Sequence, residues 1–326
     1  MTLVLPDLGK FKRLAVLGAG TMGTGWITQG AARGVEVVCA DKKQSSLDSM
    51  TGLSGKLLSI MAKPKVGLLE ESEVEPAKGR ITCLDPSDDT ETLIKGLAEC
   101  EPDLFIEVVD EKLGLKQEIF ELAAQHFGPN VVLASNTSSV LCRRLAAATG
   151  QPDRTIVLHG MNPVPLMGGV ECVIAEDADP TTRDWCFELF EGWGKEPFRA
   201  PDRPGFLINR IMMPAWFQMI EDIQERLVRV QDVDRGFRSS VSHPQGGLYL
   251  LEQIGLKIMW QVGEAILDET SDPRYRAPLL LVEMVKAGFL GKMGDKGGFY
   301  DWTEPKNPKP RDLEFFDQFE TKAPIG

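Results

Sequence analysis

A glycine-rich turn near the start of the chain constrains its fold more than any other feature. The turn follows an apolar run at 14–17 and precedes a stretch at 21–33 that is compatible with a helix. Its residues are Gly18, Ala19, Gly20, Thr21, Met22 and Gly23. In such a turn the first glycine permits a sharp bend, the second lets a pyrophosphate approach the backbone, and the third lets the helix pack close to the strand. The free N–H groups and the dipole of the helix then face the phosphates.

An acidic residue at the end of the next strand completes this pattern. The run at 35–40 has the apolar character of a buried parallel strand, and Asp41 follows it directly. A carboxylate in this place accepts hydrogen bonds from the adenosine ribose and disfavours a 2′-phosphate, so the sequence predicts an NAD site. Lys42 and Lys43 would soften this preference, although a solvated loop explains them more simply. The candidate cofactor-binding residues of this segment are Gly18, Gly20, Thr21, Met22, Gly23 and Asp41.

Strands and helices alternate through the first 200 residues. After the two strands above, apolar runs predict strands at 81–83, 103–109, 131–134, 155–158 and 170–174. Between them the pattern predicts a helical arm at 45–75 and helices at 90–100, 115–126, 140–148 and 181–193. This alternation is typical of a doubly wound, mostly parallel sheet of the Rossmann type.

The pattern changes at 200–205, where proline and glycine crowd together. Beyond this point we predict a helix at 206–230, with a kink at Pro214. We also predict a helix through Ser239 that the residues 231–234 cap, and further helices at 248–267 and 278–287. A glycine-rich loop follows at 288–300, and the proline-rich, charged tail is expected to be flexible. We therefore expect an α/β fold whose N-terminal Rossmann-type domain is followed by an all-α C-terminal domain. The expected boundaries are 1–200 for the NAD-binding domain, 201–302 for the helical domain and 303–326 for the tail.

Composition excludes several classes of function. The formal net charge of −12 argues against a basic face for nucleic acid. No run reaches the roughly 18 apolar residues of a membrane span, and the short segment before the first strand leaves no room for a signal peptide. Six dispersed cysteines without CxxC spacing predict reduced thiols in a cytoplasmic protein. The three histidines share no ligand spacing, so no metal site is expected.

His159 and Glu171 are the candidate acid–base pair. His159 follows a buried strand, and Glu171 lies on the strand that returns after a hairpin-like excursion, so the two side chains are expected to meet. Histidine accepts a proton near neutral pH, and an adjacent carboxylate fixes the tautomer and stabilises the imidazolium. Taken alone, a single histidine after a buried strand is more simply interpreted as a structural residue with satisfied hydrogen bonds. His159 differs from His126 and His243 because it lies at the carboxyl edge of the predicted sheet, where ligands bind.

A hydroxyl-rich loop at 135–139 lies at the same predicted edge. The loop contains Ser135, Asn136, Thr137, Ser138 and Ser139 and follows the strand at 131–134. Its position is where substrate and nicotinamide are expected to meet. The same side chains are also suited to cap the helix predicted at 140–148. The two interpretations are compatible, because one serine can cap while another contacts a ligand.

Together these segments resemble the L-3-hydroxyacyl-CoA dehydrogenase family, which includes 3-hydroxybutyryl-CoA dehydrogenases. The resemblance extends over almost the whole chain, from about Lys12 to Trp302. Its carriers are the segments 18–23, 107–111, 135–139, 159–165, 204–210 and 297–300. The spacing between the serine loop, the histidine and the glutamate also resembles that of the family.

The resemblance implies roles for individual residues. His159 corresponds to the general base and Glu171 to its orienting partner, while Ser138 and Asn209 correspond to residues that hydrogen-bond substrate at the reacting centre. Asn162 corresponds to a contact on the nicotinamide side. The residues that the resemblance assigns to cofactor binding are Glu111, Lys116, Ser138, Asn162 and a lysine of the glycine-rich loop at 288–300, called the closing loop. This closing-loop lysine is Lys296 or Lys292.

The implied reaction is the interconversion of an L-3-hydroxyacyl-CoA and a 3-ketoacyl-CoA, with NAD as hydride carrier and a homodimer formed by the helical domain. Two departures place the identity of the substrate in question. Gly168-Gly169 follows Met167 where the family usually has a lysine, and Gln245-Gly246-Gly247 replaces a usual Met-Gly-Pro. The alternatives are the same chemistry on a non-CoA hydroxy acid of the L-gulonate or carnitine type, or a non-catalytic NAD-binding protein.

Overall fold

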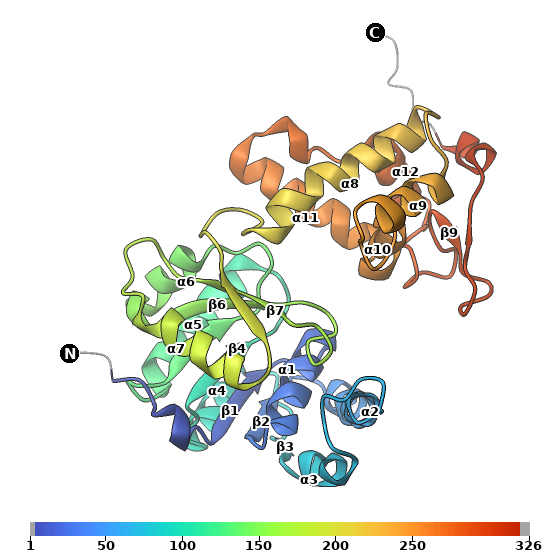
Figure 1. Cartoon of the computed structure of the whole chain (residues 1–326). Coiled ribbons are helices and arrows are strands. Elements are labelled where there is room, and N and C mark those ends of the chain that lie inside the picture. The colour runs from blue at the N-terminus through green and yellow to red at the C-terminus, as the bar shows by residue number, and fades with distance from the viewer. Residues whose placement is uncertain (1–3, 320–326) are drawn as a thin grey trace. The chain divides into compact units, whose positions relative to one another are not determined.

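The chain forms two compact units, Met1–Phe206 and Leu207–Gly326. The computed structural model describes residues 4–319 (Figure 1). None of the helices in these residues is long and apolar enough to cross a membrane. Over the same range, no group of three or more His, Cys, Asp or Glu side chains is arranged to hold a metal ion.

The first unit is built on an eight-stranded sheet in the order β3-β2-β1-β4-β5-β6-β7-β8. Neighbouring strands run parallel except for β6 and β7, which are antiparallel. The strands are β1 (Arg13–Leu17), β2 (Glu36–Ala40), β3 (Ile81–Cys83), β4 (Leu104–Glu107), β5 (Val132–Ser135), β6 (Thr155–Gly160), β7 (Gly169–Val173) and β8 (Glu196–Arg199). The predicted α/β fold with a doubly wound, mostly parallel sheet is confirmed.

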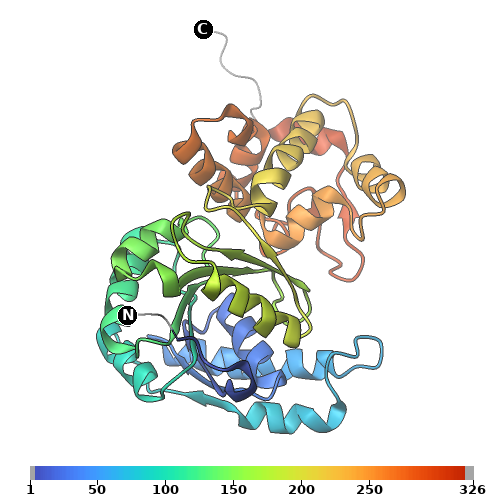
Figure 2. The ribbon, with the colours of Figure 1, turned by 60° about the vertical axis from the view of Figure 1, so that its left-hand side comes forward.

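Helices cover both faces of this sheet (Figures 1 and 2). They are α1 (Thr21–Ala32), α2 (Gln44–Met61), α3 (Val74–Gly79), α4 (Thr90–Glu99), α5 (Leu113–His126), α6 (Cys142–Thr149) and α7 (Thr181–Gly192). Alternate strand residues point to opposite faces. Leu14 and Val16 pack with α1, α2 and α7, whereas Ala15 and Leu17 pack with α4, α5 and α6.

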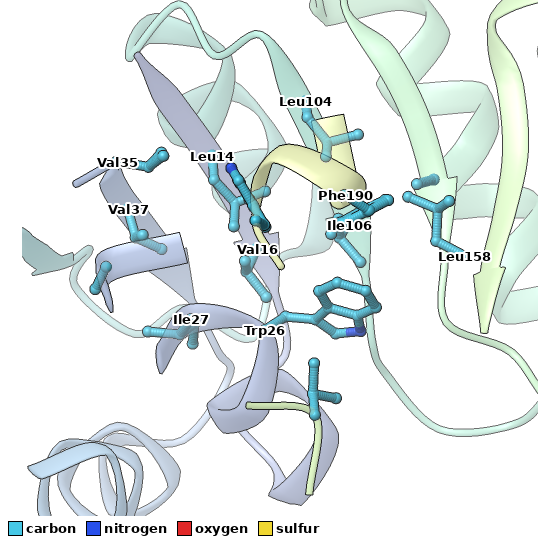
Figure 3. Packing of buried hydrophobic residues seen from close by; sticks show 14 of the residues in the cluster. Leu14, Val16, Trp26, Ile27, Val35, Val37, Leu104, Ile106, Leu158 and Phe190 are labelled. Carbon is cyan, nitrogen blue, oxygen red and sulfur yellow. The ribbon is translucent and has the colours of Figure 1, made fainter. Parts of the chain in front are cut away.

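The indole of Trp26 lies at the centre of the first of these layers (Figure 3). Trp26 is fully buried and its ring centroid lies 5.4 Å from that of Phe190 on α7. Its Nε1 donates to the Asn136 side-chain oxygen over 2.7 Å, so the polar end of the ring is satisfied. This contact links the helix that follows the glycine turn to the loop after β5.

The second unit is helical. Its helices are α8 (Ile208–Gln224), α9 (Val230–Ser240), α10 (Gly247–Ile254), α11 (Leu256–Thr270) and α12 (Leu279–Lys286). The predicted single helix at 248–267 is wrong, because Gly255 adopts a positive φ of 105° and separates α10 from α11. The prediction that 231–234 caps α9 is also wrong. Asp234 instead accepts hydrogen bonds from the backbone N–H groups of Leu248 and Tyr249 in the first turn of α10.

Part of the tail at 303–326, which the sequence predicts to be flexible, has a defined structure. Lys309–Pro310 (β10) pairs with Tyr300–Asp301 (β9), and a short 3-10 helix spans Leu313–Gln318. Phe316 and Phe319 are buried in the core of the helical unit. Apolar burial therefore holds this segment in place, in spite of its charged neighbours. Residues 320–326 lie outside the described range.

Glu252 ties the end of the glycine-rich loop to α10. The carboxylate is fully buried and accepts hydrogen bonds from the Phe299 backbone N–H at 2.6 Å and from the Trp302 indole at 2.7 Å. Burial raises the pKa of Glu252 to about 7, although these donors act in the opposite direction.

This pKa predicts a pH-dependent stability. The folded chain holds the Glu252 proton more tightly than the unfolded chain, so the free energy of unfolding should fall as pH rises from about 4.5 to about 7. The full effect is on the order of 3 kcal/mol. In Glu252→Gln this titration is absent, so the melting temperature of the wild type relative to the variant should fall between about pH 5 and about pH 8. A difference that does not change with pH would contradict this assignment.

Candidate active site

The glycine turn after β1 has the conformation that a dinucleotide requires. Gly18 has a φ of +107°, and its N–H donates to the Ala40 carbonyl over 2.8 Å. A Cβ on Gly23 would lie 1.9 Å from the Gly18 oxygen, whereas a Cβ on Gly20 would meet nothing within 4 Å. Helix α1 starts after Gly20 without a side-chain cap. The space at Gly20 and the uncapped first turn of α1 fit a pyrophosphate.

The two glycines offer a matched pair of substitutions. Gly23→Ala should lower stability by about 1–3 kcal/mol, because its methyl group overlaps the Gly18 carbonyl. Gly20→Ala should leave the melting temperature almost unchanged but weaken NADH binding, because its methyl group fills only the space that the cofactor needs. Thermal unfolding and NADH fluorescence titration measure the two effects. Equal loss of stability in both variants would contradict the distinct roles given to these glycines.

Asp41 lies directly beside this turn. Its Oδ2 accepts from the Ala19 backbone N–H at 2.8 Å, and its Oδ1 accepts from the Lys43 N–H at 2.9 Å. The carboxylate is thereby held at the carboxyl end of β2, next to the glycine turn. Lys42 and Lys43 are exposed, in agreement with a solvated loop.

His159 and Glu171 meet across the antiparallel strands β6 and β7. The two residues are direct register partners, and His159 Nδ1 lies 2.5 Å from Glu171 Oε2. Glu171 is fully buried and His159 is 6% exposed. The carboxylate accepts from Nδ1–H, so the lone pair of the imidazole lies on Nε2. The predicted hairpin-like excursion therefore brings the two side chains together.

Ser138 lies on the other side of the imidazole. Its Oγ is 3.1 Å from His159 Nε2. The ring centroid of Phe206 lies 5.7 Å from that of His159 and covers a further part of it. The Nε2 atom is thus beside a hydroxyl group, in a largely dry setting where a transferred proton and a substrate oxygen would be sensitive to nearby charge.

The hydroxyl-rich loop is wrapped around one carboxylate oxygen. Glu111 Oε1 accepts from the backbone N–H of Ser138 at 2.8 Å, from that of Ser139 at 2.9 Å and from the hydroxyl groups of Ser139 and Thr137. Burial alone would raise the pKa of Glu111, but the Lys116 ammonium and these donors hold this pKa below its usual value. An ionised Glu111 therefore fixes the backbone on both sides of the Ser138 Cα.

A second carboxylate, Glu107, supports the loop from the sheet side. Glu107 is fully buried, and its oxygens accept from Ser135 Oγ at 2.6 Å, from the Val109 N–H at 2.6 Å and from Lys116 Nζ at 2.7 Å. Lys116 is 1% exposed and also lies 3.2 Å from Glu111. The ammonium therefore bridges the two carboxylates, and its predicted contact with the cofactor stays a prediction.

The segment between β6 and β7 carries Asn162, which is exposed. Lys195 anchors this segment, because its Nζ donates to the carbonyls of Val164 at 2.5 Å and Met167 at 2.8 Å. Burial lowers the pKa of Lys195 to about 8, with a smaller contribution from Arg33. The nicotinamide-side role of Asn162 remains a prediction.

The helical unit carries the other predicted residues. Asn209 is half-buried in the first turn of α8. Lys296 Nζ donates to the Ala287 carbonyl at 2.8 Å, and Lys292 Nζ donates to Gln253 at 2.8 Å. Both lysines therefore bond within their own unit, and the choice between them as a cofactor contact remains open to experiment.

Some supporting residues are missed by the sequence interpretation. The sequence suggests that side chains of the loop at 135–139 cap the helix after it, but they do not cap α6. Asp202, which is buried, caps this helix by accepting from the backbone N–H groups of Cys142 at 2.7 Å and Arg143 at 2.9 Å. The signals for Glu107 were its place as an acid in the mostly apolar predicted strand at 103–109 and at the start of the family-like segment 107–111, and neither gave it a role. Lys195 had no signal in its local sequence.

Comparison with known proteins shows which family the chain belongs to. Two family models match the chain: the NAD binding domain of 3-hydroxyacyl-CoA dehydrogenase over residues 13–203, and its C-terminal domain over residues 205–302. The chain is 35% identical to 3-hydroxybutyryl-CoA dehydrogenase of Bradyrhizobium diazoefficiens, over 90% of this chain and 97% of that protein. It is 34% identical to the Mycobacterium tuberculosis enzyme of the same name, over 89% of this chain and 98% of that protein.

Solved structures show the same likeness. The crystal structure of M. tuberculosis FadB2 matches with a TM-score of 0.81 and 32% identity, over 90% of this chain and 99% of that one. (S)-3-Hydroxybutyryl-CoA dehydrogenase PaaH1 from Ralstonia eutropha matches with a TM-score of 0.79 and 32% identity, over 90% of this chain and all of that one. The chain therefore belongs to the 3-hydroxyacyl-CoA dehydrogenase family and is an NAD-dependent oxidoreductase.

Proposed function

We propose that this chain interconverts L-3-hydroxyacyl-CoA and 3-ketoacyl-CoA by a His159–Glu171 dyad. The observation that carries the proposal is the 2.5 Å contact between His159 Nδ1 and the buried Glu171 carboxylate, with Ser138 Oγ 3.1 Å from Nε2. The Glu171 carboxylate on one side of the imidazole and the Ser138 hydroxyl group on the other suit His159 for proton removal from an alcohol. The names of the relatives supply the thioester class.

In the oxidative direction, His159 Nε2 takes the proton of the substrate 3-hydroxyl group. Glu171 stabilises the resulting imidazolium, because a buried carboxylate interacts more strongly with a nearby positive charge than an exposed one. Ser138 donates a hydrogen bond to the same substrate oxygen and orients it. NAD⁺, when bound at the glycine turn, supplies the acceptor for the hydride that leaves C3. In the reductive direction, His159 returns the proton to the oxygen.

The glycine turn, Asp41 and Glu111 bind the cofactor in this proposal, together with Thr21 and Met22 at the start of α1. Asn162 and the closing-loop lysine are further contacts implied by the resemblance, and Asn209 is a substrate contact on the same grounds. The resemblance also implies Lys116 as a cofactor contact, although its ammonium already bridges Glu107 and Glu111.

A substrate panel tests this proposal. NADH oxidation should be measured with acetoacetyl-CoA, with a longer 3-ketoacyl-CoA and with a free keto acid at equal concentrations. We expect turnover with the thioesters and little with the free acid. The reverse preference would favour a non-CoA hydroxy acid and would point to the departures at Gly168-Gly169 and Gln245. NADH binding without turnover on any of these substrates would support the non-catalytic alternative.

We also propose a homodimer formed through the helical unit. The resemblance implies this arrangement. Two large apolar side chains of that unit are at least half exposed: Ile211 on α8 is 58% exposed and Ile258 on α11 is 50% exposed. Burial of such side chains in an interface removes apolar area from water. Light scattering should give twice the chain mass of 36.0 kDa. A monomer mass at working concentration would remove this proposal.

A further inference from the structure

Two cysteines lie side by side at the edge of the sheet that carries the cofactor turn. Cys39 on β2 and Cys83 on β3 are direct register partners, and their Sγ atoms are 3.4 Å apart. All six cysteines lie within residues 4–319 and have free thiols, and Cys83 is the one that is exposed. Cys39 is fully buried. The pair therefore combines a thiol that reagents can reach with a second thiol directly behind it.

We propose that Cys39 and Cys83 form an oxidisable dithiol, which a peroxide converts to a disulfide that weakens NAD binding. Neighbouring strands lie about 4.7–4.9 Å apart, within the range of Cα separations that a disulfide spans. The sulfur atoms must approach by about 1.3 Å to reach the S–S bond length. The two side chains leave the sheet on the same face, because their residues are in register.

Exposure fixes the order of the two steps. The Cys83 sulfur attacks the peroxide, the O–O bond breaks, and Cys83 becomes a sulfenic acid while water or an alcohol leaves. The Cys39 sulfur then attacks the sulfenic sulfur, the S–O bond breaks, and water leaves as the S–S bond forms. The two thiols lose two electrons and two hydrogens, and the peroxide is reduced. Burial, with a smaller contribution from Cys83, raises the pKa of Cys39, so Cys39 is poorly suited to react first.

The position of Cys39 connects this reaction to the cofactor. Cys39 is followed on β2 by Ala40, whose carbonyl accepts from the Gly18 N–H at 2.8 Å. Asp41 comes next and holds the Ala19 N–H at 2.8 Å. Movement of the Cys39 sulfur towards β3 therefore displaces the strand end that fixes both the glycine turn and the ribose-binding carboxylate.

The test is limited oxidation of the full chain with hydrogen peroxide, followed by thiol counting, peptide mapping and NADH titration. We expect a loss of two hydrogens in mass and a tryptic cross-link between the peptides 34–42 and 81–95. The dissociation constant for NADH should rise at least fivefold and return to its initial value after treatment with dithiothreitol.

Two variants make this test specific. Cys83→Ser should bind NADH normally and should keep its affinity after peroxide treatment. Cys100→Ser, which removes a half-buried thiol elsewhere, should respond to peroxide as the wild type does. Oxygen addition at Cys83 without the cross-linked peptides would overturn the dithiol proposal. A complete cross-link with unchanged NADH affinity would overturn its connection to the cofactor turn. Neither outcome depends on which substrate the enzyme uses.

Discussion

Replacing His159 with glutamine is expected to lower kcat for NADH oxidation on a 3-ketoacyl-CoA by about 10²–10⁴-fold, the usual contribution of a general acid–base residue. The glutamine amide keeps a hydrogen-bond donor in this pocket, so the buried Glu171 carboxylate is not left beside an apolar side chain. The amide does not exchange a proton with the substrate near neutral pH. The loss should therefore appear in the chemical step rather than in folding.

The control for this prediction is cofactor binding. None of the hydrogen bonds of the glycine turn and Asp41 involves His159, so the NADH dissociation constant of His159→Gln should stay within about threefold of wild type, which corresponds to less than about 1 kcal/mol. Steady-state kinetics and fluorescence titration measure the two quantities on the same preparation. Near-wild-type turnover in this variant would show that His159 is a structural residue.

Replacing Lys116 with methionine should destabilise the first unit by about 3–5 kcal/mol, the cost of leaving a buried charge without its partner. Lys116 is 1% exposed, and its ammonium lies 2.7 Å from the fully buried Glu107 and 3.2 Å from Glu111. Methionine fills a similar volume but leaves both carboxylates without this cation. Urea unfolding at neutral pH measures the change in the free energy of unfolding.

Two further variants separate the buried charge from other causes. Lys112→Met removes a lysine just before α5 whose side chain is 74% exposed and lies 4.0 Å from Asp110, so its effect should stay within about 0.5 kcal/mol. Adding Glu107→Gln to Lys116→Met should restore part of the lost stability, because the pair is then neutral. A loss below about 1 kcal/mol in Lys116→Met would contradict the bridging role.

The same double variant addresses the predicted cofactor contact of Lys116. If the ammonium also touches the cofactor, NADH binding should weaken in the folded double variant. If its role is confined to bridging Glu107 and Glu111, NADH affinity should be retained, while kcat falls because the loop that carries Ser138 is less well held. Titration and kinetics on one protein distinguish these results.

The sequence predicts well those parts of the fold that residues close together in the chain determine. The glycine turn, the strand before it and the acid after β2 lie within 30 residues, and each has its own steric or electrostatic reason. The contact between His159 and Glu171 was also predictable, because a strand and its returning neighbour bring them into register. Local patterns of this kind do not depend on the rest of the chain.

The parts that sequence misses depend on contacts between distant segments. Asp202 caps α6 from a position far along the chain, and no local pattern announces this. Glu107 is tolerated inside a buried strand because Lys116 and Ser135 satisfy it from two other elements. In the tail, Phe316 and Phe319 are buried, although the surrounding prolines and charges resemble a solvated segment. Tertiary packing decides each of these cases.

In the proposed function, the His159–Glu171 dyad of this NAD-dependent enzyme acts on a 3-ketoacyl thioester. The most direct measurement is the steady-state rate of NADH oxidation by the wild-type chain with acetoacetyl-CoA, at an NADH concentration shown by titration to saturate the protein. We expect saturable turnover with a kcat in the ordinary range of enzymes, about 1–10³ s⁻¹. Bound NADH that is not oxidised in the presence of acetoacetyl-CoA or any longer 3-ketoacyl-CoA would contradict it.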